Sequence, residues 1–161
     1  FVNRYIQRTS DIVRAHGGVI DNIAGDGIQA MFGTEHRPDA RVAAVACARA
    51  ILDDARVTRA LPRFEGFGAV RIGLHRGTVM FGAFGGADRR EITAHGSPIN
   101  IAARLVDTCR SLGYDICASE NALGPGHGGG GWRSIGEVRL RGVASPVEVW
   151  TLASAPAPEH P

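Results

Sequence analysis

Two polar side chains in an otherwise apolar stretch, Asn100 and Arg104, have types and a spacing that could do chemistry. They follow a short β-like run that breaks at Gly96, after which Ser97 and Pro98 fit the N-cap and first position of a helix. Residues four apart share one helix face, so the two polar groups would be presented together. This pair suits an anionic, hydrogen-bonding ligand such as a phosphate or a sugar oxygen. The alternative is an exposed helix face with an incidental polar pair.

A carboxylate at a predicted hairpin tip, Asp26, is the second candidate. It lies in the turn Gly25–Gly27 between the apolar runs 19–24 and 28–32, and glycine supplies the backbone angles that such turns need. Mg²⁺ is usually held by one or two carboxylates together with substrate phosphates, so Asp26 is a candidate metal ligand. The alternative is turn chemistry, in which the side chain bonds only to its own backbone.

The remaining pattern predicts the elements that position these residues. Helices are expected over 1–16, ending at Gly17-Gly18, and from Pro38 to about Leu61. A second hairpin is expected over 69–84, with His75 and Arg76 at a solvated turn. The expected strands toward the C-terminus are 114–118, 132–140 and 147–152.

Antiparallel hairpins that alternate with helices predict an α+β sandwich, in which helices pack on a mixed, largely antiparallel sheet. At 161 residues the chain is long enough for one domain with its own core. We place the domain at 1–152 and an Ala/Pro-rich, disordered tail at 153–161. No apolar run approaches the length of a membrane span and no signal peptide is present, so we expect a cytoplasmic domain.

Composition argues against several function classes. The net charge is +2, and all 18 basic residues are scattered arginines, so no dense basic block predicts nucleic-acid binding. An RNA-binding sheet would expose stacking aromatics, and only 6% of residues are aromatic. The three cysteines are odd in number and lack C-x-x-C spacing, which is typical of reduced packing residues.

Four collinear blocks, HGGVIDNIAGDGIQAMFG, VRIGLHRGTVMFGAFG, ITAHGSPINIAARL and LRGVASPVEVW, resemble successive motifs of the class III nucleotide (adenylyl/guanylyl) cyclase catalytic domain. The resemblance runs from residue 1 to about 152. It implies a ferredoxin-like sandwich, the nucleotide cyclase fold, whose first strand and helix precede residue 1. A sensor or membrane region would also precede residue 1 in a full-length protein.

The resemblance assigns roles to individual residues. Asp26 matches the second of two metal-binding aspartates, and the first would lie upstream of residue 1. Asn100 matches the asparagine that orients the ribose, and Arg104 the arginine that stabilises the pentavalent phosphorus. Arg141 falls where the family has a basic residue that contacts the terminal phosphates.

The implied activity is conversion of ATP to 3′,5′-cyclic AMP and pyrophosphate with two Mg²⁺ or Mn²⁺ ions. It implies a head-to-tail homodimer in which Asp26 comes from one protomer and the asparagine and arginines from the other. Asn22 and Thr93 occupy the base-selecting positions, and we favour ATP because bacterial members with Thr at the second position are adenylyl-like. The alternatives are a guanylyl cyclase and a catalytically inactive cyclase-homology module that dimerises or regulates.

Overall fold

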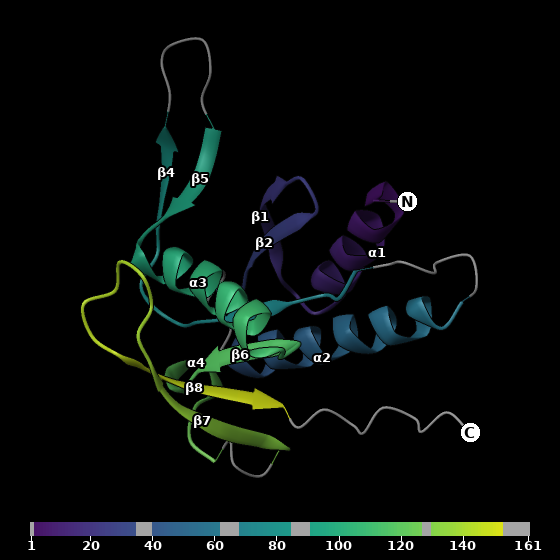
Figure 1. Cartoon of the computed structure of the whole chain (residues 1–161). Helices are drawn as coiled ribbons and strands as arrows, with labels where there is room; N and C mark the ends of the chain where they lie inside the picture. The colour runs from purple at the N-terminus through teal and green to yellow at the C-terminus, as the bar shows by residue number, and fades with distance from the viewer. Residues whose placement is uncertain (1, 35–39, 62–67, 85–90, 127–129, 153–161) are drawn as a thin grey trace, which may run out of the picture. The chain divides into compact units, whose positions relative to one another are not determined.

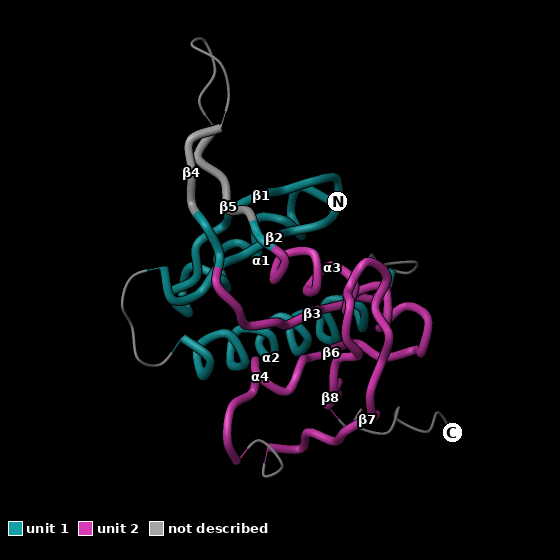
Figure 2. Tube along the Cα trace, turned by 90° about the vertical axis from the view of Figure 1, so that its left-hand side faces the viewer, with its two compact units in different colours: residues 1–68, 79–96 teal, residues 69–78, 97–161 magenta. Residues whose placement is uncertain are grey.

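The structure of the chain is a computed structural model that describes residues 2–34, 40–61, 68–84, 91–126 and 130–152. The chain divides into two compact units, drawn in two colours in Figure 2. The first unit comprises residues 1–68 and 79–96, and the second comprises residues 69–78 and 97–161. Three chain crossings therefore join the units.

The first unit combines two helices with two antiparallel strand pairs (Figure 1). Its elements are α1 (Val2–Ala15), β1 (Val19–Ala24), β2 (Gly27–Met31), α2 (Ala40–Arg59), β4 (Met80–Phe84) and β5 (Glu91–His95). Strand β1 pairs with β2, β4 pairs with β5, and β1 also contacts β5. Helix α1 packs on α2 and on both strands of the first pair. The predicted helices and the predicted first hairpin are thereby confirmed.

Helix α1 ends in a Schellman motif built on two glycines. Gly17 has a φ of 77°, and the Gly18 N–H donates to the Val13 carbonyl at 2.9 Å. A Cβ on Gly18 would come within 2.6 Å of the Phe32 ring and 2.8 Å of the Val13 side chain. The glycine pair therefore both ends the helix and lets the start of β1 approach the end of β2.

The second unit places one long helix against a four-stranded sheet (Figure 1). Its elements are β3 (Ile72–Leu74), α3 (Ser97–Leu112), β6 (Ile116–Ser119), α4 (Glu120–Leu123), β7 (Trp132–Val138) and β8 (Val147–Leu152). The strand order is β3-β6-β8-β7, with β3 parallel to β6 and the other neighbours antiparallel. The predicted α+β class with a mixed sheet is confirmed, as is the closing pair β7–β8.

The core of the second unit lies between α3 and this sheet. Its buried members are Leu105, Cys109, Cys117, Leu140 and Val149. The Cys109 thiol donates to the Ile72 carbonyl at 3.3 Å, and its hydrogen bond with Cys117 together with burial raises its pKa. All three cysteines of the chain are free and buried, which confirms their expected role as packing residues.

One predicted element is wrong: residues 69–84 do not form a hairpin. The first half, β3, pairs in parallel with β6, and the second half, β4, pairs with β5 over five residues. Residues 75–79 between them have no regular secondary structure, and a Cβ at Gly77 would lie 2.4 Å from the Pro98 ring. The partner of β3 lies far along the chain and that of β4 is the next strand, and the alternation of apolar residues reveals neither pairing.

Two other differences are smaller. The short helix α4 directly after β6 was not predicted. The strand predicted at 114–118 is observed at 116–119, as β6. The predicted tail, 153–161, lies outside the described residues.

The contact of β3 with α3 gives a stability prediction. A Cβ at Gly73 would meet the Ala102 carbonyl oxygen at 2.2 Å and the Val106 amide nitrogen at 3.0 Å, and neither backbone atom can give way cheaply. We expect Gly73→Ala to destabilise the second unit by about 1–3 kcal/mol, the usual cost of overpacking, measured by thermal and urea unfolding. Gly68→Ala is the matched control, because nothing lies within 4 Å of its added Cβ. Equal stability of the two variants would contradict the packing that we describe.

Candidate functional site

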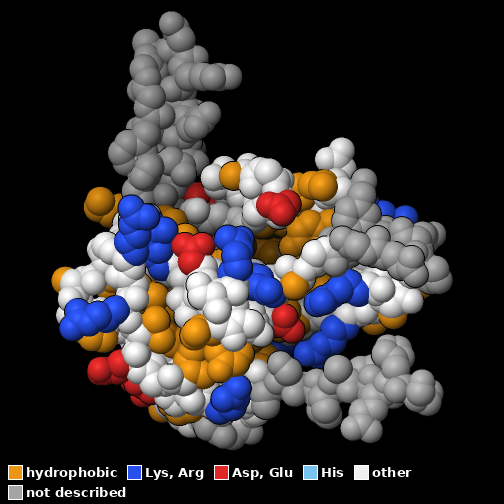
Figure 3. All heavy atoms as spheres, viewed as in Figure 1, with side chains coloured by type: hydrophobic (Ala, Val, Ile, Leu, Met, Phe, Trp, Pro, Cys, Tyr) orange, Lys and Arg blue, Asp and Glu red, His pale blue; other side chains and the backbone are white. Residues whose placement is uncertain are grey.

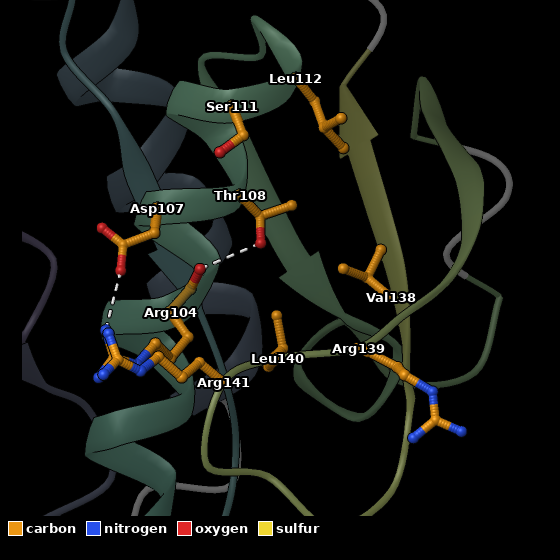
Figure 4. A pocket seen from close by; sticks show the side chains of 9 residues that line it. All are labelled: Arg104, Asp107, Thr108, Ser111, Leu112, Val138, Arg139, Leu140 and Arg141. Atoms are coloured by element: carbon orange, nitrogen blue, oxygen red, sulfur yellow. Dashed lines mark hydrogen bonds and ion pairs between the residues drawn. The ribbon is translucent and has the colours of Figure 1, made fainter.

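A pocket in the second unit is lined by two of the predicted site residues, Arg104 and Arg141 (Figure 4). Arg104 comes from the middle of α3, and Arg141 comes from the turn between β7 and β8. The pocket is open, with a volume of about 370 Å³, which lies within the range of small-molecule sites. Its other lining residues are Asp107, Thr108, Ser111, Leu112, Val138, Arg139 and Leu140.

The turn that presents Arg141 is anchored by its neighbours. Leu140 is buried in the core, and its carbonyl accepts a hydrogen bond from the Val143 N–H at 3.1 Å. Gly142, at the third position of this turn, has a φ of 79°, as a type II turn requires. The side chain of Arg141 extends toward α3, whereas that of Arg139 points away (Figure 4).

Arg104 is held on α3 by interactions on its own helix. Its guanidinium pairs with Asp107 at 3.2 Å, and its carbonyl accepts from the Thr108 hydroxyl at 3.0 Å. Asp107 also lies 3.9 Å from the Arg110 guanidinium. The Arg104 side chain is 43% exposed, so the ion pair is solvated and easily exchanged for another anion.

The electrostatics of the pocket favour an anionic ligand. Two arginines reach it from opposite walls, and the described residues that line it include one carboxylate, that of Asp107. Guanidinium groups bind phosphate in a forked, bidentate geometry, so two of them suit a polyphosphate better than a single carboxylate. Leu112 and Val138 add apolar surface at the other end of the pocket (Figure 4).

Asn100 lies one turn before Arg104 on α3 and is exposed. It is not one of the residues that line the pocket. The predicted helix is therefore confirmed, and with it the shared face of the two residues. A joint contact of both with one ligand remains a prediction.

Asp26 is exposed at the tip of the β1–β2 hairpin in the first unit. Gly25 before it has a φ of 61°, and Asp26 itself has no positive φ, which is the pattern of a type II′ turn. An exposed carboxylate with a fixed backbone can supply one oxygen ligand to Mg²⁺ or Mn²⁺ while phosphates and water supply the rest. No cluster of three or more His, Cys, Asp or Glu side chains forms a metal site within the described ranges.

Tyr5 is a neighbour of Asp26 that the sequence did not single out. Burial raises the pKa of this α1 phenol, a hydrogen bond with Thr9 lowers it, and the charge of Asp26 raises it, so Tyr5 and Asp26 lie within electrostatic reach. The signal that could have found it is its place in the first helix.

The candidate base-selecting residues lie on neighbouring strands of the first unit. Asn22 is exposed on β1, and Thr93 lies on β5, where its Cα is paired with that of Gly82. A register shift after Ile20 makes Asp21 an extra, bulged residue, and its carboxylate accepts from the Gln29 amide at 2.6 Å. Strand β1 contacts β5.

On the face drawn in Figure 3, arginine side chains lie among acidic, neutral and apolar ones.

Comparisons with known proteins point to one class of enzyme. Adenylate cyclase 1 of Rhizobium meliloti is 27% identical over 159 residues, which cover 94% of this chain and 23% of that protein. The adenylyl cyclase CyaB of P. aeruginosa is 25% identical with a TM-score of 0.81, and the match covers 96% of this chain and 81% of that one. The guanylyl cyclase Cya2 is 28% identical with a TM-score of 0.74, and the match covers 98% and 81%. No family model matches the chain.

The chain spans about a quarter of the length of the curated relatives that it matches. None of the helices in the described ranges has the length and apolar character that a membrane crossing requires.

The Arg104–Asp107 pair gives a prediction about anion affinity. We expect Asp107→Asn to tighten pyrophosphate binding several-fold, because it removes a negative charge from the pocket and frees the Arg104 guanidinium. Isothermal titration calorimetry at low salt measures this change. Asp53→Asn is the matched control, since Asp53 pairs with Arg56 at the same 3.2 Å and the same helical spacing on α2. Equal gains in both variants would mean that the pocket is not the binding site.

Proposed function

We propose that this chain, which has the fold of the class III nucleotide cyclase catalytic domain, converts ATP to 3′,5′-cyclic AMP and pyrophosphate in bacterial signalling. The observation that carries the proposal is the pocket between α3 and the β7–β8 turn, into which Arg104 and Arg141 both reach. Those two arginines fall at the positions that the resemblance assigns to phosphate recognition.

Each arginine has a distinct part in the proposed reaction. Arg141 binds the terminal phosphates and so fixes the leaving pyrophosphate. Arg104 donates to the oxygens of the α-phosphate, where negative charge increases as the ribose 3′-oxygen attacks. An interaction that strengthens only as the transition state forms accelerates the chemical step. Asn100, one turn earlier on the same helix face, orients the ribose through its amide.

Asp26 is the proposed metal ligand of this chain. Mg²⁺ or Mn²⁺ held there would lower the pKa of the attacking hydroxyl and neutralise charge on the phosphates. A second carboxylate ligand is expected from upstream of residue 1, as the resemblance implies. The exposure of Asp26 leaves its oxygens available for such a shared site.

The proposed base preference rests on Asn22 and Thr93. The Asn22 amide both donates and accepts hydrogen bonds, so by itself it discriminates weakly between adenine and guanine. Thr93 favours adenine by its resemblance to adenylyl-type bacterial members. Guanylyl activity is the alternative, since a guanylyl cyclase is also among the similar structures.

We further propose a head-to-tail homodimer in which each site is shared. Asp26 would come from one protomer, and Asn100, Arg104 and Arg141 from its partner. In each chain Asp26 belongs to the first compact unit and the other three residues belong to the second.

A second candidate function is a cyclase-homology module that dimerises or binds nucleotide without catalysis. The favouring observation is that Asp26 is the one carboxylate of this chain matched to a metal-binding position. An assay of the full-length protein that contains this chain, with ATP and GTP separately in Mn²⁺, decides between these functions. Cyclic AMP supports the proposal, cyclic GMP reverses the base assignment, and a folded dimer that makes neither product supports the module.

Arg104→Ala tests the transition-state role. We expect kcat to fall about 10²–10³-fold with a smaller change in KM, as for the loss of a group that binds developing charge. The matched control is Arg110→Ala, because Arg110 lies on the same helix, contacts the same Asp107 and is 73% exposed. Unchanged turnover of Arg104→Ala in steady-state assays would rule out the role given to Arg104.

Mixing two inactive variants tests the shared site. Asp26→Ala and Arg104→Ala proteins damage opposite halves of it, so a mixed dimer contains one intact site. Each mixed dimer should therefore show up to about half of the turnover of a wild-type dimer, which has two intact sites. Turnover is measured after subunit exchange, with mixed dimers verified by differential tagging. Failure of rescue in verified mixed dimers would contradict the shared arrangement.

A further inference from the structure

A chain of hydrogen bonds in the second unit joins the segment after β3 to the start of α4. His75 Nδ1 lies 2.7 Å from the Ser119 hydroxyl oxygen, and that hydroxyl donates to the Asn121 side-chain oxygen at 2.6 Å. The Asn121 amide nitrogen in turn donates to the Arg76 carbonyl at 2.8 Å. The four groups form a loop that begins and ends on adjacent residues.

The direction of every hydrogen bond in this loop follows from the Arg76 carbonyl. The Arg76 carbonyl can only accept, so the nitrogen of the Asn121 amide must face it and the amide oxygen must face Ser119. Ser119 has one proton, which it gives to Asn121. His75 must therefore donate from Nδ1, so it is the Nδ1–H tautomer or the imidazolium. Burial lowers the pKa of His75, which favours the neutral tautomer.

This direction excludes a serine nucleophile. A base would have to accept the Ser119 proton, but here the imidazole donates to that oxygen. Ser119 is also 1% exposed, so no substrate carbonyl can reach its oxygen. The network therefore holds these residues in place and does not form a hydrolytic site.

The segment that the network fixes is in close contact with α3 at two points. A Cβ at Gly73 would lie 2.2 Å from the Ala102 carbonyl oxygen, and a Cβ at Gly77 would lie 2.4 Å from the Pro98 ring. His75 lies midway between these glycines, and its Nε2 is 3.8 Å from the Cβ position of Gly77. The two contacts bracket the turn of α3 that carries Asn100.

We propose that His75 is a positioning residue, which through Ser119 and Asn121 holds the segment after β3 against the first two turns of α3 and so sets the placement of Asn100 and Arg104. The consequence for catalysis rests on the function proposed above. The consequence for α3 itself does not, because it follows from contacts within the second unit.

Two variants of His75 separate the Nδ1 hydrogen bond from general packing. Asparagine places an amide N–H where Nδ1 lies, whereas glutamine places it where Nε2 lies. We expect His75→Asn to keep the bond to Ser119 and His75→Gln to lose it. Asn121→Asp is a second, isosteric test, because it keeps the acceptor for Ser119 and loses the donor to the Arg76 carbonyl.

The first measurement is hydrogen exchange of the amides of residues 101–104, whose helical acceptors are the carbonyls of residues 97–100. We expect exchange to quicken about tenfold in His75→Gln and Asn121→Asp and to stay near wild type in His75→Asn. His16→Gln is the control, since His16 Nδ1 bonds to the Ile12 carbonyl at 2.8 Å in the other unit. Equal exchange in His75→Asn and His75→Gln overturns the proposal.

The second measurement is turnover by the same proteins. We expect kcat to fall about tenfold or more in His75→Gln with KM changed less, and to recover in His75→Asn, because small misplacements of catalytic groups act on the chemical step. A kcat unchanged in His75→Gln overturns the catalytic half of the proposal. If wild type makes no cyclic nucleotide, the proposed function fails, and the exchange data alone decide whether His75 positions α3.

Discussion

The approach of β3 to the backbone of α3 is the constraint on which the second unit depends. At Gly73 the strand lies so close that a single added methyl group would overlap the Ala102 carbonyl. That approach orients α3 so that Leu105 and Cys109 are buried against the sheet. Arg104, the neighbour of Leu105 in sequence, is then on the flank of the helix, where it lines the pocket. The packing of one face of α3 against the sheet thus determines which side chains the flank of the helix presents to a ligand.

The pocket is assembled from a rigid wall and a turn. The wall is α3, and the turn is held by the burial of Leu140 and by the left-handed backbone at Gly142. Within the part of the chain that the structure describes, Arg141 forms no ion pair, so its guanidinium is available for an anion. Arg104 does have a partner, Asp107, on the next turn of the helix. Because that ion pair is solvated, replacing the Asp107 carboxylate by a phosphate as the partner of Arg104 costs little free energy.

Much of the fold could be predicted from the sequence, because helices and tight hairpins are encoded locally. The apolar stripe of α1 ending at Gly17-Gly18, and the Gly-Asp-Gly turn before β2, required no knowledge of the rest of the chain. The partners of β3 and β4 could not be predicted, since parallel pairing with β6 is decided by packing on α3. For the same reason His75 is expected from the sequence at a solvated turn, whereas in the structure its ring nitrogen lies within hydrogen-bond distance of Ser119.

The candidate site was predictable to a similar extent and for similar reasons. Asn100, Arg104 and Asp26 stand out because polar residues at regular spacing interrupt apolar runs or occupy a turn tip. The face of β1 on which Asn22 lies could not be predicted in this way. The bulge at Asp21 interrupts the alternation of faces along the strand from which it would be read. Selection between two purines depends on the direction of a few hydrogen bonds. If Asn22 selects the base as proposed above, the bulge at Asp21 makes base preference depend on the backbone as much as on the residue type.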